Sequence, residues 1–407
     1  MSDRVRVLVS AGYSEGHAFP ALALSRALGE RGHEVMVELS ERWRDTVGGL
    51  GFGFTPARDY VLPGAAPAGA GEPTAIDVAR SLVATIGAFD PDVVVSDLVA
   101  AAPALAAEVA EVPNATLIPT VYPVQGRGLP PFQVGLVAPR TGLGSVAWRA
   151  IEPAVRPLRP NTRWLRRVSG LLGAARAELG LPPLPPDRPV TTYGTVSEGL
   201  AMVATFPQLE YPRDWPARTH VTGPMQFELE HPDVELPPGD RPLVLVAAST
   251  VHGGGGGLIR AALRALEAEP VRILATINAR GQTWSEPAPE NTAVVDWLSY
   301  GQVMPRAAVV ITSGGHGTVA RALAAGVPVL VCPGGAESAE NGARVTWAGA
   351  GLMLPSRLQR SRALRSAVRR LLDDGRFAAR AKEIAAWARA NDGARRGAEL
   401  VERYARR

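Results

Sequence analysis

The stretch VLVSAGYSEGHAFPALALSRAL, residues 7–28, decides the fold of this chain of 407 residues. The apolar run at residues 5–10 predicts a β-strand, and the Ala- and Leu-rich run at residues 20–32 predicts a helix. A loop with two glycines joins them, and it carries His17, three residues before Pro20. A strand that passes through a glycine-containing loop into a helix is the repeating unit of parallel α/β sheets. The opening stretch therefore predicts such a sheet, with an imidazole at the mouth of its first turn.

The same alternation of strands and helices continues to residue 120 and begins again after residue 240. Continuous apolar runs such as PDVVVSD, residues 91–97, are typical of strands covered on both faces. The sequence thus predicts an α/β protein with two Rossmann-like domains facing each other across a cleft. We expect an N-terminal domain, a linker, a C-terminal domain and one final helix, which packs back on the N-terminal domain, at residues 1–222, 223–240, 241–380 and 381–407.

Composition and charge restrict the class of protein. Apolar residues make up 46% and aromatic residues 6% of the chain, as in soluble globular proteins. The net charge of +4 is spread along the chain without interleaved aromatic residues, which disfavours nucleic-acid binding. The N-terminus lacks a signal-peptide pattern, and no apolar run is long enough to span a bilayer. We therefore expect a cytoplasmic protein with no integral membrane segment and no nucleic-acid partner.

Metal and disulfide chemistry are not predicted. Cys332 is the only cysteine, which leaves no disulfide framework and no cysteine-based zinc site. The six histidines show no HExxH spacing, and the chain has no GxSxG motif.

Three polar features follow predicted strands, where ligands of open α/β sheets bind. His17 follows the first strand, Asp97 ends the strand at residues 91–97, and the loop SGGHGT, residues 313–318, lies between a strand and a helix. Free N–H groups and the helix dipole at such a loop attract phosphate, although a tight turn without a ligand has the same pattern. Asp97 either caps the helix that follows it or partners a nearby base.

Two further stretches leave their role open. The run HGGGGG, residues 252–257, is either a mobile loop or a second contact to phosphate. The segment CPGGAESAENGARV contains Glu337, Glu340 and Asn341 directly after an apolar strand. These carboxylates either accept hydrogen bonds from sugar hydroxyls or form an N-terminal helix cap.

Taken together, these motifs resemble the family 1 glycosyltransferases of the GT-B fold, especially the bacterial natural-product enzymes. The family's N-terminal motif G-H-x-x-P is matched by GHAFP, residues 16–20. Its C-terminal signature runs from a tryptophan through a glycine-rich phosphate loop to an acidic sugar contact, and residues 297–345 have this order. The resemblance covers nearly the whole chain.

The resemblance implies an inverting, metal-independent hexosyltransferase that uses a nucleotide-diphosphate sugar as co-substrate and no cofactor. The donor would be a UDP- or dTDP-hexose, and the acceptor a hydroxyl of a small, apolar or aromatic natural product bound against the loops at residues 122–164. The protein would be a monomer or homodimer. His17 matches the general base and Asp97 the carboxylate that orients it. The residues that match or neighbour the donor-binding motifs are Ser249, Thr250, Trp297, Ser299, Tyr300, Ser313, Gly314, Gly315, His316, Gly317, Thr318, Glu337, Ser338 and Asn341, with Gly12 and Ser14 in the N-terminal loop.

The chain departs from the family pattern in ways that concern the donor. Ser313 replaces the leading histidine of H-G-G-x-G-T, and His316 fills the variable position. The usual W-x-P-Q has become WLSY, residues 297–300, and the usual Asp-Gln pair has become Glu337-Ser338. The sequence therefore selects neither glucose nor one of the two nucleotides.

Chemical reasoning supports the role that the resemblance gives His17. An alcohol is a weak nucleophile at neutral pH and needs a base that titrates near neutrality. Three other functions stay open: an N-acetylglucosaminyltransferase acting on a lipid-linked precursor, a nucleotide-sugar epimerase of the same fold, and a non-catalytic sugar-nucleotide-binding helper protein.

Overall fold

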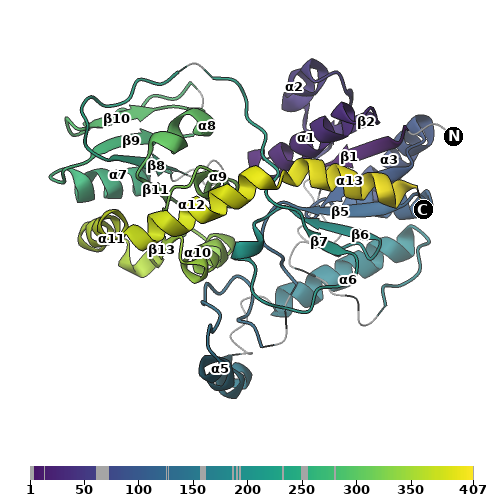
Figure 1. Ribbon diagram of the computed structural model, residues 1–407. Coiled ribbons are helices and arrows are strands. Elements are labelled where there is room, and N and C mark those ends of the chain that lie inside the picture. Colours follow the sequence, from purple (N-terminus) through teal and green to yellow (C-terminus); the bar gives the residue numbers. More distant parts are fainter. Residues whose placement is uncertain are drawn as a thin grey trace.

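Two parallel β-sheets, one in each half of the chain, form the framework of the computed structural model (Figure 1). The N-terminal sheet has seven strands in the order β3-β2-β1-β4-β5-β6-β7. These strands are β1 (Arg6–Ser10), β2 (Glu34–Leu39), β3 (Gly53–Pro56), β4 (Val93–Asp97), β5 (Asn114–Ile118), β6 (Leu200–Val203) and β7 (Thr219–Val221). The structure describes residues 4–12, 14–60, 73–124, 126, 128–155, 162–185, 188, 191, 194–231, 233–248, 255–278 and 281–406.

The C-terminal sheet has six strands in the order β10-β9-β8-β11-β12-β13. They are β8 (Leu243–Ala247), β9 (Arg272–Thr276), β10 (Thr292–Val295), β11 (Val309–Thr312), β12 (Val329–Val331) and β13 (Gly351–Met353). In each sheet the strand order runs outward in both directions from the first strand of the domain. The loops that follow the two central strands therefore leave toward opposite sides, which creates a switch point between them. The predicted α/β architecture with two Rossmann-like domains is confirmed.

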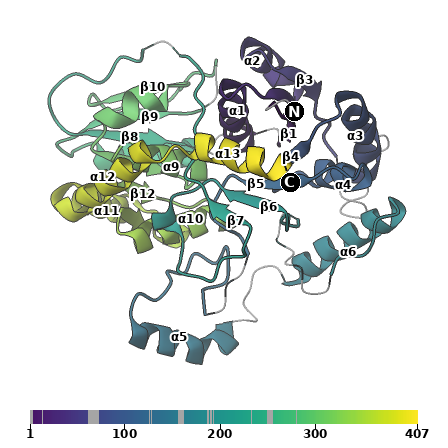
Figure 2. The same ribbon diagram turned by 45° about the vertical axis from the view of Figure 1, so that its right-hand side comes forward.

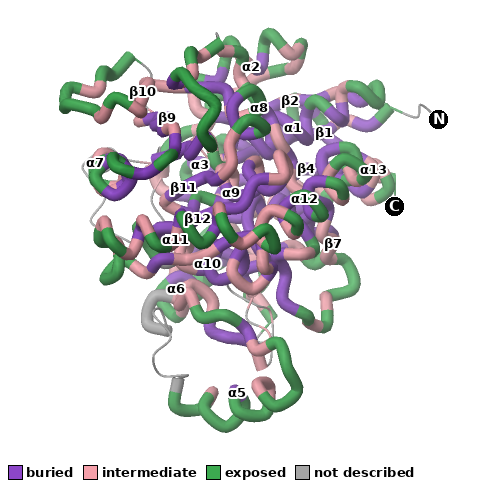
Figure 3. The backbone as a smooth tube through the Cα atoms, turned by 60° about the vertical axis from the view of Figure 1, so that its left-hand side comes forward, coloured by how far each residue is buried: buried purple, intermediate pink, exposed green. Residues whose placement is uncertain are grey.

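Helices cover both faces of the N-terminal sheet. Successive side chains of each strand point to opposite faces, so apolar strands need a cover on both. Val7 and Val9 of β1 pack in a core with α1 (Glu15–Glu30) and α13 (Gly393–Ala405). Leu8 points the other way, into a core with α3 (Ala75–Phe89) and α4 (Ala101–Val109). Figure 3 shows the buried stretches running through the interior and the exposed ones along the outer turns.

The C-terminal sheet is covered in the same way. Leu245 of β8 packs in the core that includes residues of α9 (His316–Ala324), α10 (Ala336–Ala348) and α12 (Gly375–Ala390). Val244 and Val246 face the opposite core, with α7 (Gly255–Leu266) and α11 (Ser361–Asp373).

The remaining described helical segments lie in loops and connections. They are η1 (Glu41–Trp43), α2 (Arg44–Gly49), α5 (Gly142–Val155), α6 (Thr162–Glu178), η3 (Pro207–Leu209), α8 (Tyr300–Val303), η4 (Met304–Arg306) and η5 (Ser356–Leu358). Figure 2 shows α5 standing apart from both sheets. No helix in the described part of the chain combines the length and apolarity needed to cross a bilayer.

The tail differs from the single helix expected at residues 381–407. It forms two helices, and the chain changes direction at Asn391 and Asp392, where the Asp392 carboxylate accepts the N–H groups of Ala394 and Arg395 at 2.9 and 3.0 Å. An aspartate in this N-cap position starts a new helix. The expected boundary at residues 380–381 therefore falls inside α12, which packs on α9, whereas α13 crosses to α1 of the other domain (Figure 1).

Helix α1 also starts earlier than expected, at Glu15 instead of Pro20. Proline lacks the N–H that would bond to the carbonyl one turn before it, so it usually opens a helix. Here Pro20 lies inside α1, and His17 occupies the first turn of the helix instead of the preceding loop. The strands β3, β6, β7, β10 and β13 were not predicted, because each has only three or four residues and so short a run is not distinguished from a loop in the sequence.

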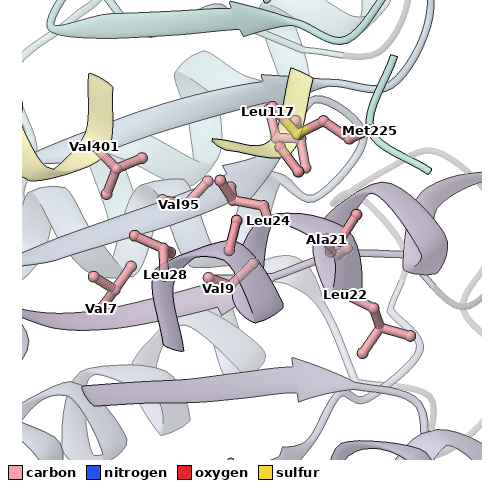
Figure 4. Packing of buried hydrophobic residues seen from close by; sticks show 14 of the residues in the cluster. Val7, Val9, Ala21, Leu22, Leu24, Leu28, Val95, Leu117, Met225 and Val401 are labelled. Atoms are coloured by element: carbon pink, nitrogen blue, oxygen red, sulfur yellow. The ribbon is translucent and has the colours of Figure 1, made fainter. Parts of the chain in front are cut away.

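The core between β1, α1 and α13 generates a stability prediction. Leu24 is fully buried there, near Leu28, Val401 and Met225 (Figure 4). Leu24→Ala should lower the free energy of unfolding by about 2–5 kcal/mol, because it leaves a cavity in a packed core. Urea titration followed by circular dichroism measures this. Leu143→Ala on α5 is the matched control, since Leu143 is 86% exposed, and it should change stability by less than about 0.5 kcal/mol. Equal losses would contradict the assigned core.

Candidate functional site

A cavity of about 620 Å³ lies between the two domains, lined by the residues that follow the carboxyl ends of strands in both sheets. The N-terminal wall comes from the loop after β1, the start of α1 and the residues that follow β4, β5 and β6. The C-terminal wall comes from the residues that follow β8 and β9, the loop between β11 and α9, and the start of α10. Both domains thus contribute to one site.

Most of the residues singled out from the sequence meet at this cavity. Those that line it are Gly12, Ser14, His17, Trp297, Tyr300, Ser313, Gly314, Gly315, His316, Gly317, Thr318, Glu337 and Ser338. Asp97 lies directly behind His17. Ser249 and Thr250 lie outside the described residues.

His17 and Asp97 form a hydrogen-bonded pair on the N-terminal wall. His17 Nδ1 lies 3.0 and 2.9 Å from the two carboxylate oxygens of Asp97. Because a carboxylate only accepts hydrogen bonds, Nδ1 carries the proton and Nε2 is left as the acceptor. The Asp97 carboxylate also accepts the N–H of Val99 at 2.9 Å, and its side chain is fully buried. Asp97 therefore does not cap α4, which begins at Ala101; it orients His17.

Several influences act on the pKa of His17. Burial, the largest, lowers it, but the Asp97 charge, the hydrogen bond to Asp97 and the Glu337 charge raise it, and the net pKa lies above the ordinary value of 6.5. Glu337 belongs to α10 on the opposite wall, so a charge of the C-terminal domain raises the pKa of a histidine in the N-terminal domain.

The glycine loop forms the C-terminal wall. It leaves β11 at Ser313, turns at Gly314 with φ of +92°, and enters α9 after Gly315. The first N–H groups of α9 have no partner within the helix, and the helix dipole adds positive potential at the same end. This end of α9 faces His17 across the cavity and is suited to bind an anion.

His316 and Glu337 lie beside this loop. His316 is buried, and burial lowers the pKa of His316 even though Glu337 and Asn341 act to raise it. The imidazole is therefore neutral near pH 7. The Glu337 carboxylate of the C-terminal wall acts on the charge of both His17 and His316.

The sequence and the fold agree with known proteins along the whole chain. The chain is 30% identical over 427 residues to 4′-demethylrebeccamycin synthase of Lentzea aerocolonigenes, covering 98% of this chain and 99% of that protein. Residues 261–402 match the family described as erythromycin biosynthesis protein CIII-like, C-terminal domain. The chain belongs to the GT-B glycosyltransferases of natural-product biosynthesis.

Solved structures show the same fold in both domains of this glycosyltransferase. The glycotransferase of kitacinnamycin superposes with a TM-score of 0.76 at 22% identity, covering 99% of this chain and 100% of that one. The glycosyltransferase VinC, solved in complex with dTDP, superposes with a TM-score of 0.66 at 20% identity, covering 98% and 99%.

Two residues predicted to bind the donor do not line the cavity of the glycosyltransferase. Asn341 is buried behind the loop, where its Nδ2 donates to the Gly314 carbonyl at 2.9 Å. Ser299 caps the short helix α8, and its hydroxyl donates to Glu228 at 2.7 Å. Through these bonds Asn341 supports the turn at Gly314, and Ser299 supports the start of α8.

Glu340 does not take the expected role of a sugar contact. Arg344 of α10 is buried and lies 2.8 Å from Glu340 and 3.0 Å from Glu210 of the N-terminal domain. Glu210 accepts the N–H of Tyr122 at 2.7 Å, and Glu340 accepts that of Gln133 at 3.1 Å. Glu340 thus joins the domains beside the cavity and does not face a sugar.

The loops expected to hold the acceptor do not line the cavity. No described residue between 122 and 164 belongs to its wall. Part of this segment packs on the other domain instead: Arg140 donates to the carbonyls of Thr346 and Trp347, and the N–H of Gln133 donates to the Glu340 carboxylate. Among the described residues, no group of three or more His, Cys, Asp and Glu side chains could hold a metal ion.

The sequence did not single out six polar residues that line the cavity: Glu15, Thr120, Gln226, Glu228, Asn278 and Arg321. Asn278 comes two residues after the apolar strand β9, so the rule that identified Asp97 would have found it. Arg321 lies four residues after Gly317 on one helix face, which is also visible in the sequence. Glu228 lies in the linker, and no sequence pattern marks it.

The turn at Gly314 predicts that a side chain at this position destabilises the protein. A Cβ on Gly314 would lie 2.8 Å from Val331 Cγ1 and 2.9 Å from the Ser338 carbonyl oxygen, and its φ is unfavourable for other residues. Gly314→Ala should lower the free energy of unfolding by about 2–4 kcal/mol, because strain and overlap add. Gly315→Ala is the control, since nothing lies within 4 Å and φ is −59°; it should cost less than about 1 kcal/mol. Denaturant unfolding compares them, and equal stability would refute the turn.

The pair of His17 and Asp97 predicts a titration. In the wild-type protein His17 should titrate above pH 6.5, and Asp97→Asn should lower its pKa, because burial then outweighs the remaining attraction. Since the folded pKa is the higher one, the pair stabilises the protein fully below the unfolded pKa and loses this effect as the pH rises through the folded pKa. NMR titration of labelled histidine, assigned with His17→Gln, measures both values. Identical curves for the two proteins would contradict the pairing.

Proposed function

We propose that this glycosyltransferase moves a hexose from a UDP- or dTDP-sugar to a hydroxyl of a small apolar or aromatic natural product, with inversion at the anomeric carbon and without a metal ion. One observation carries the proposal: the pair of His17 and Asp97 faces the glycine loop at the start of α9 across a single cavity. A base on one wall and an anion site on the other are what a direct displacement requires.

The N-terminal wall would activate the acceptor. With Nδ1 bound to Asp97, His17 Nε2 accepts the proton of the acceptor hydroxyl as the new bond from that oxygen to the anomeric carbon forms. Asp97 fixes the tautomer of the ring and balances the charge of the imidazolium. The raised pKa of His17 makes its imidazole a stronger base than a free one.

The C-terminal wall would hold the donor and its leaving group. As the bond between the anomeric carbon and the phosphate oxygen breaks, negative charge grows on the diphosphate, and the N–H groups and dipole of α9 stabilise it. Because acceptor and leaving group occupy opposite walls, attack from the face opposite the diphosphate inverts the anomeric centre. Glu337, which lines the cavity from α10, would accept hydrogen bonds from the hexose.

The substrate classes rest on the cavity and on the relatives. Apolar side chains of the cavity, among them Phe19, Leu98, Val99 and Met225, favour an apolar or aromatic acceptor. A structural neighbour of the same fold was solved with dTDP, which supports testing dTDP-sugars beside UDP-sugars.

A crossed screen of donors and acceptors, read by mass spectrometry, tests the function. The proposal expects a glycosylated acceptor and release of nucleoside diphosphate that depends on the acceptor. Release or epimerisation of the donor without acceptor would favour a nucleotide-sugar epimerase, and binding without turnover would favour a helper protein. Chelator should leave the rate unchanged.

Substitution of the base predicts a selective loss. His17→Ala should lower kcat by about 10²–10⁴-fold, because a positioned base is lost. The affinity for nucleoside diphosphate should change little, because the donor loop belongs to the other domain. Steady-state kinetics and calorimetry measure the two effects.

A more acidic acceptor provides the control for this loss. A nitrophenol that is already ionised at the assay pH should partly restore the turnover of His17→Ala, whereas an aliphatic alcohol should not. Wild-type turnover of His17→Ala on an alcohol of high pKa would show that His17 is not the base.

A further inference from the structure

Arg321 is a cation on the donor wall that the mechanism above does not use. It lies on α9, five residues after the helix begins, and its side chain lines the cavity together with Phe19, Glu228 and Tyr300. Helical side chains lean toward the N-terminus of their helix. Arg321 follows this rule, because its Nη1 lies 3.8 Å from the position of a Cβ on Gly317. The guanidinium is therefore placed over the first turn of α9.

The contacts of Arg321 leave its charge without a counter-ion. One Nη2–H donates to the carbonyl oxygen of Phe227, and the guanidinium lies 5.0 Å from the centre of the Phe19 ring. Among the described residues Arg321 has no ion-pair partner, and the Glu228 carboxylate acts on its charge only from a longer distance. A guanidinium has five N–H donors, so most of them are available to a ligand.

The nearest acidic group is already occupied. The Glu228 carboxylate accepts the Ser299 hydroxyl at 2.7 Å and the Gly301 N–H at 2.8 Å, which fixes the start of α8. Burial lowers the pKa of Arg321, and the Glu228 charge only partly opposes this. A partly desolvated cation thus lies close to the positive end of a helix, and an anion bound there would interact favourably with both.

We propose that Arg321 is a nucleotide-anchoring residue of this glycosyltransferase, whose guanidinium contacts the diphosphate of the donor beside the glycine loop. This inference rests on the proposed function, because it requires a nucleoside diphosphate at the start of α9. Charge-assisted bonds from a guanidinium to phosphate are among the strong hydrogen bonds in proteins. The same contact would strengthen as the sugar departs and the diphosphate gains charge.

A purely structural role of Arg321 is the alternative to exclude. The bond to Phe227 links α9 to the linker between the domains, so a change of Arg321 could act on the protein alone. Such a change would weaken every ligand of the cavity by the same factor. A contact to phosphate would instead weaken ligands in proportion to their phosphate groups.

Calorimetry of the full chain with thymidine, its monophosphate and its diphosphate, and with the three uridine equivalents, separates the two. Arg321→Gln keeps a donor for the Phe227 carbonyl but loses the charge. It should weaken the preferred nucleoside diphosphate by about 10–100-fold, the monophosphate less, and leave the nucleoside unchanged. Arg362→Gln, an exposed arginine on α11, is the matched control and should change nothing.

Each outcome decides the question. An equal factor for all ligands, or an unchanged diphosphate affinity, overturns the role of Arg321 while the proposed function stands. Absence of any nucleoside diphosphate binding by the wild-type protein overturns the proposed function and the inference together. If Arg321→Gln does not fold, Arg321→Lys replaces it, because lysine keeps the charge but has a single nitrogen. Arg321→Lys should lower the affinity for the diphosphate severalfold and leave the affinity for the nucleoside unchanged. An equal effect on both affinities refutes the contact.

Discussion

The parallel pairing of β1 with β4 is the constraint on which the catalytic half of the site depends. Their register places Ser10 beside Ser96, so the two strands end together at one edge of the sheet. His17, in the first turn after β1, and Asp97, the last residue of β4, are 80 residues apart in the chain and still share a hydrogen bond. In an antiparallel pair the same two strand ends would lie at opposite edges. The same rule in the C-terminal sheet brings the ends of β8, β9, β11 and β12 to the other wall.

Two strand edges make one cavity only because the domains are held against each other. Arg344 forms ion pairs with Glu340 of its own helix and Glu210 of the other domain, and its guanidinium lies 3.7 Å from the centre of the Tyr211 ring. Removing one partner from a buried ion pair leaves an uncompensated charge and typically costs about 3–5 kcal/mol. The tail adds a second link, since α12 packs on the C-terminal domain and α13 on α1. The cavity therefore depends on contacts at its rim as much as on its lining.

The electrostatics of the cavity are asymmetric in a way that suits group transfer. Burial lowers the pKa of both imidazoles, but only His17 has a bonded carboxylate that reverses the effect. His17 is thus fitted to take up a proton, while His316 stays neutral beside the helix end. Glu337 of α10 acts on the charge of both, and Arg321 adds positive charge to the wall formed by α9.

The fold class follows from the sequence alone, and most of the site residues that the sequence predicted do line the cavity. Continuous apolar strands and the motifs GHAFP and SGGHGT are local patterns, and local hydrogen bonding and burial decide what they form. The sequence missed the short strands at the sheet edges, where apolar runs are too brief to be distinguished from loops. The sequence also predicted a helix start at Pro20, because proline prefers the first turn of a helix. In the structure the helix starts at Glu15, and α1 packs on the sheet with Pro20 inside it.

Only the tertiary structure decided which polar residues face the ligand and which hold the protein together. Glu337 and Glu340 are one turn apart on α10, yet one lines the cavity and the other is buried in an ion pair with Arg344. Asn341 and Ser299 lie in the expected donor-binding segments, but the Asn341 amide nitrogen and the Ser299 hydroxyl bond to groups of the protein instead of lining the cavity. A sequence pattern gives the type and spacing of polar groups. Whether a group is free to bind depends on partners more than a hundred residues away, such as Glu210, and only the folded chain brings these into contact.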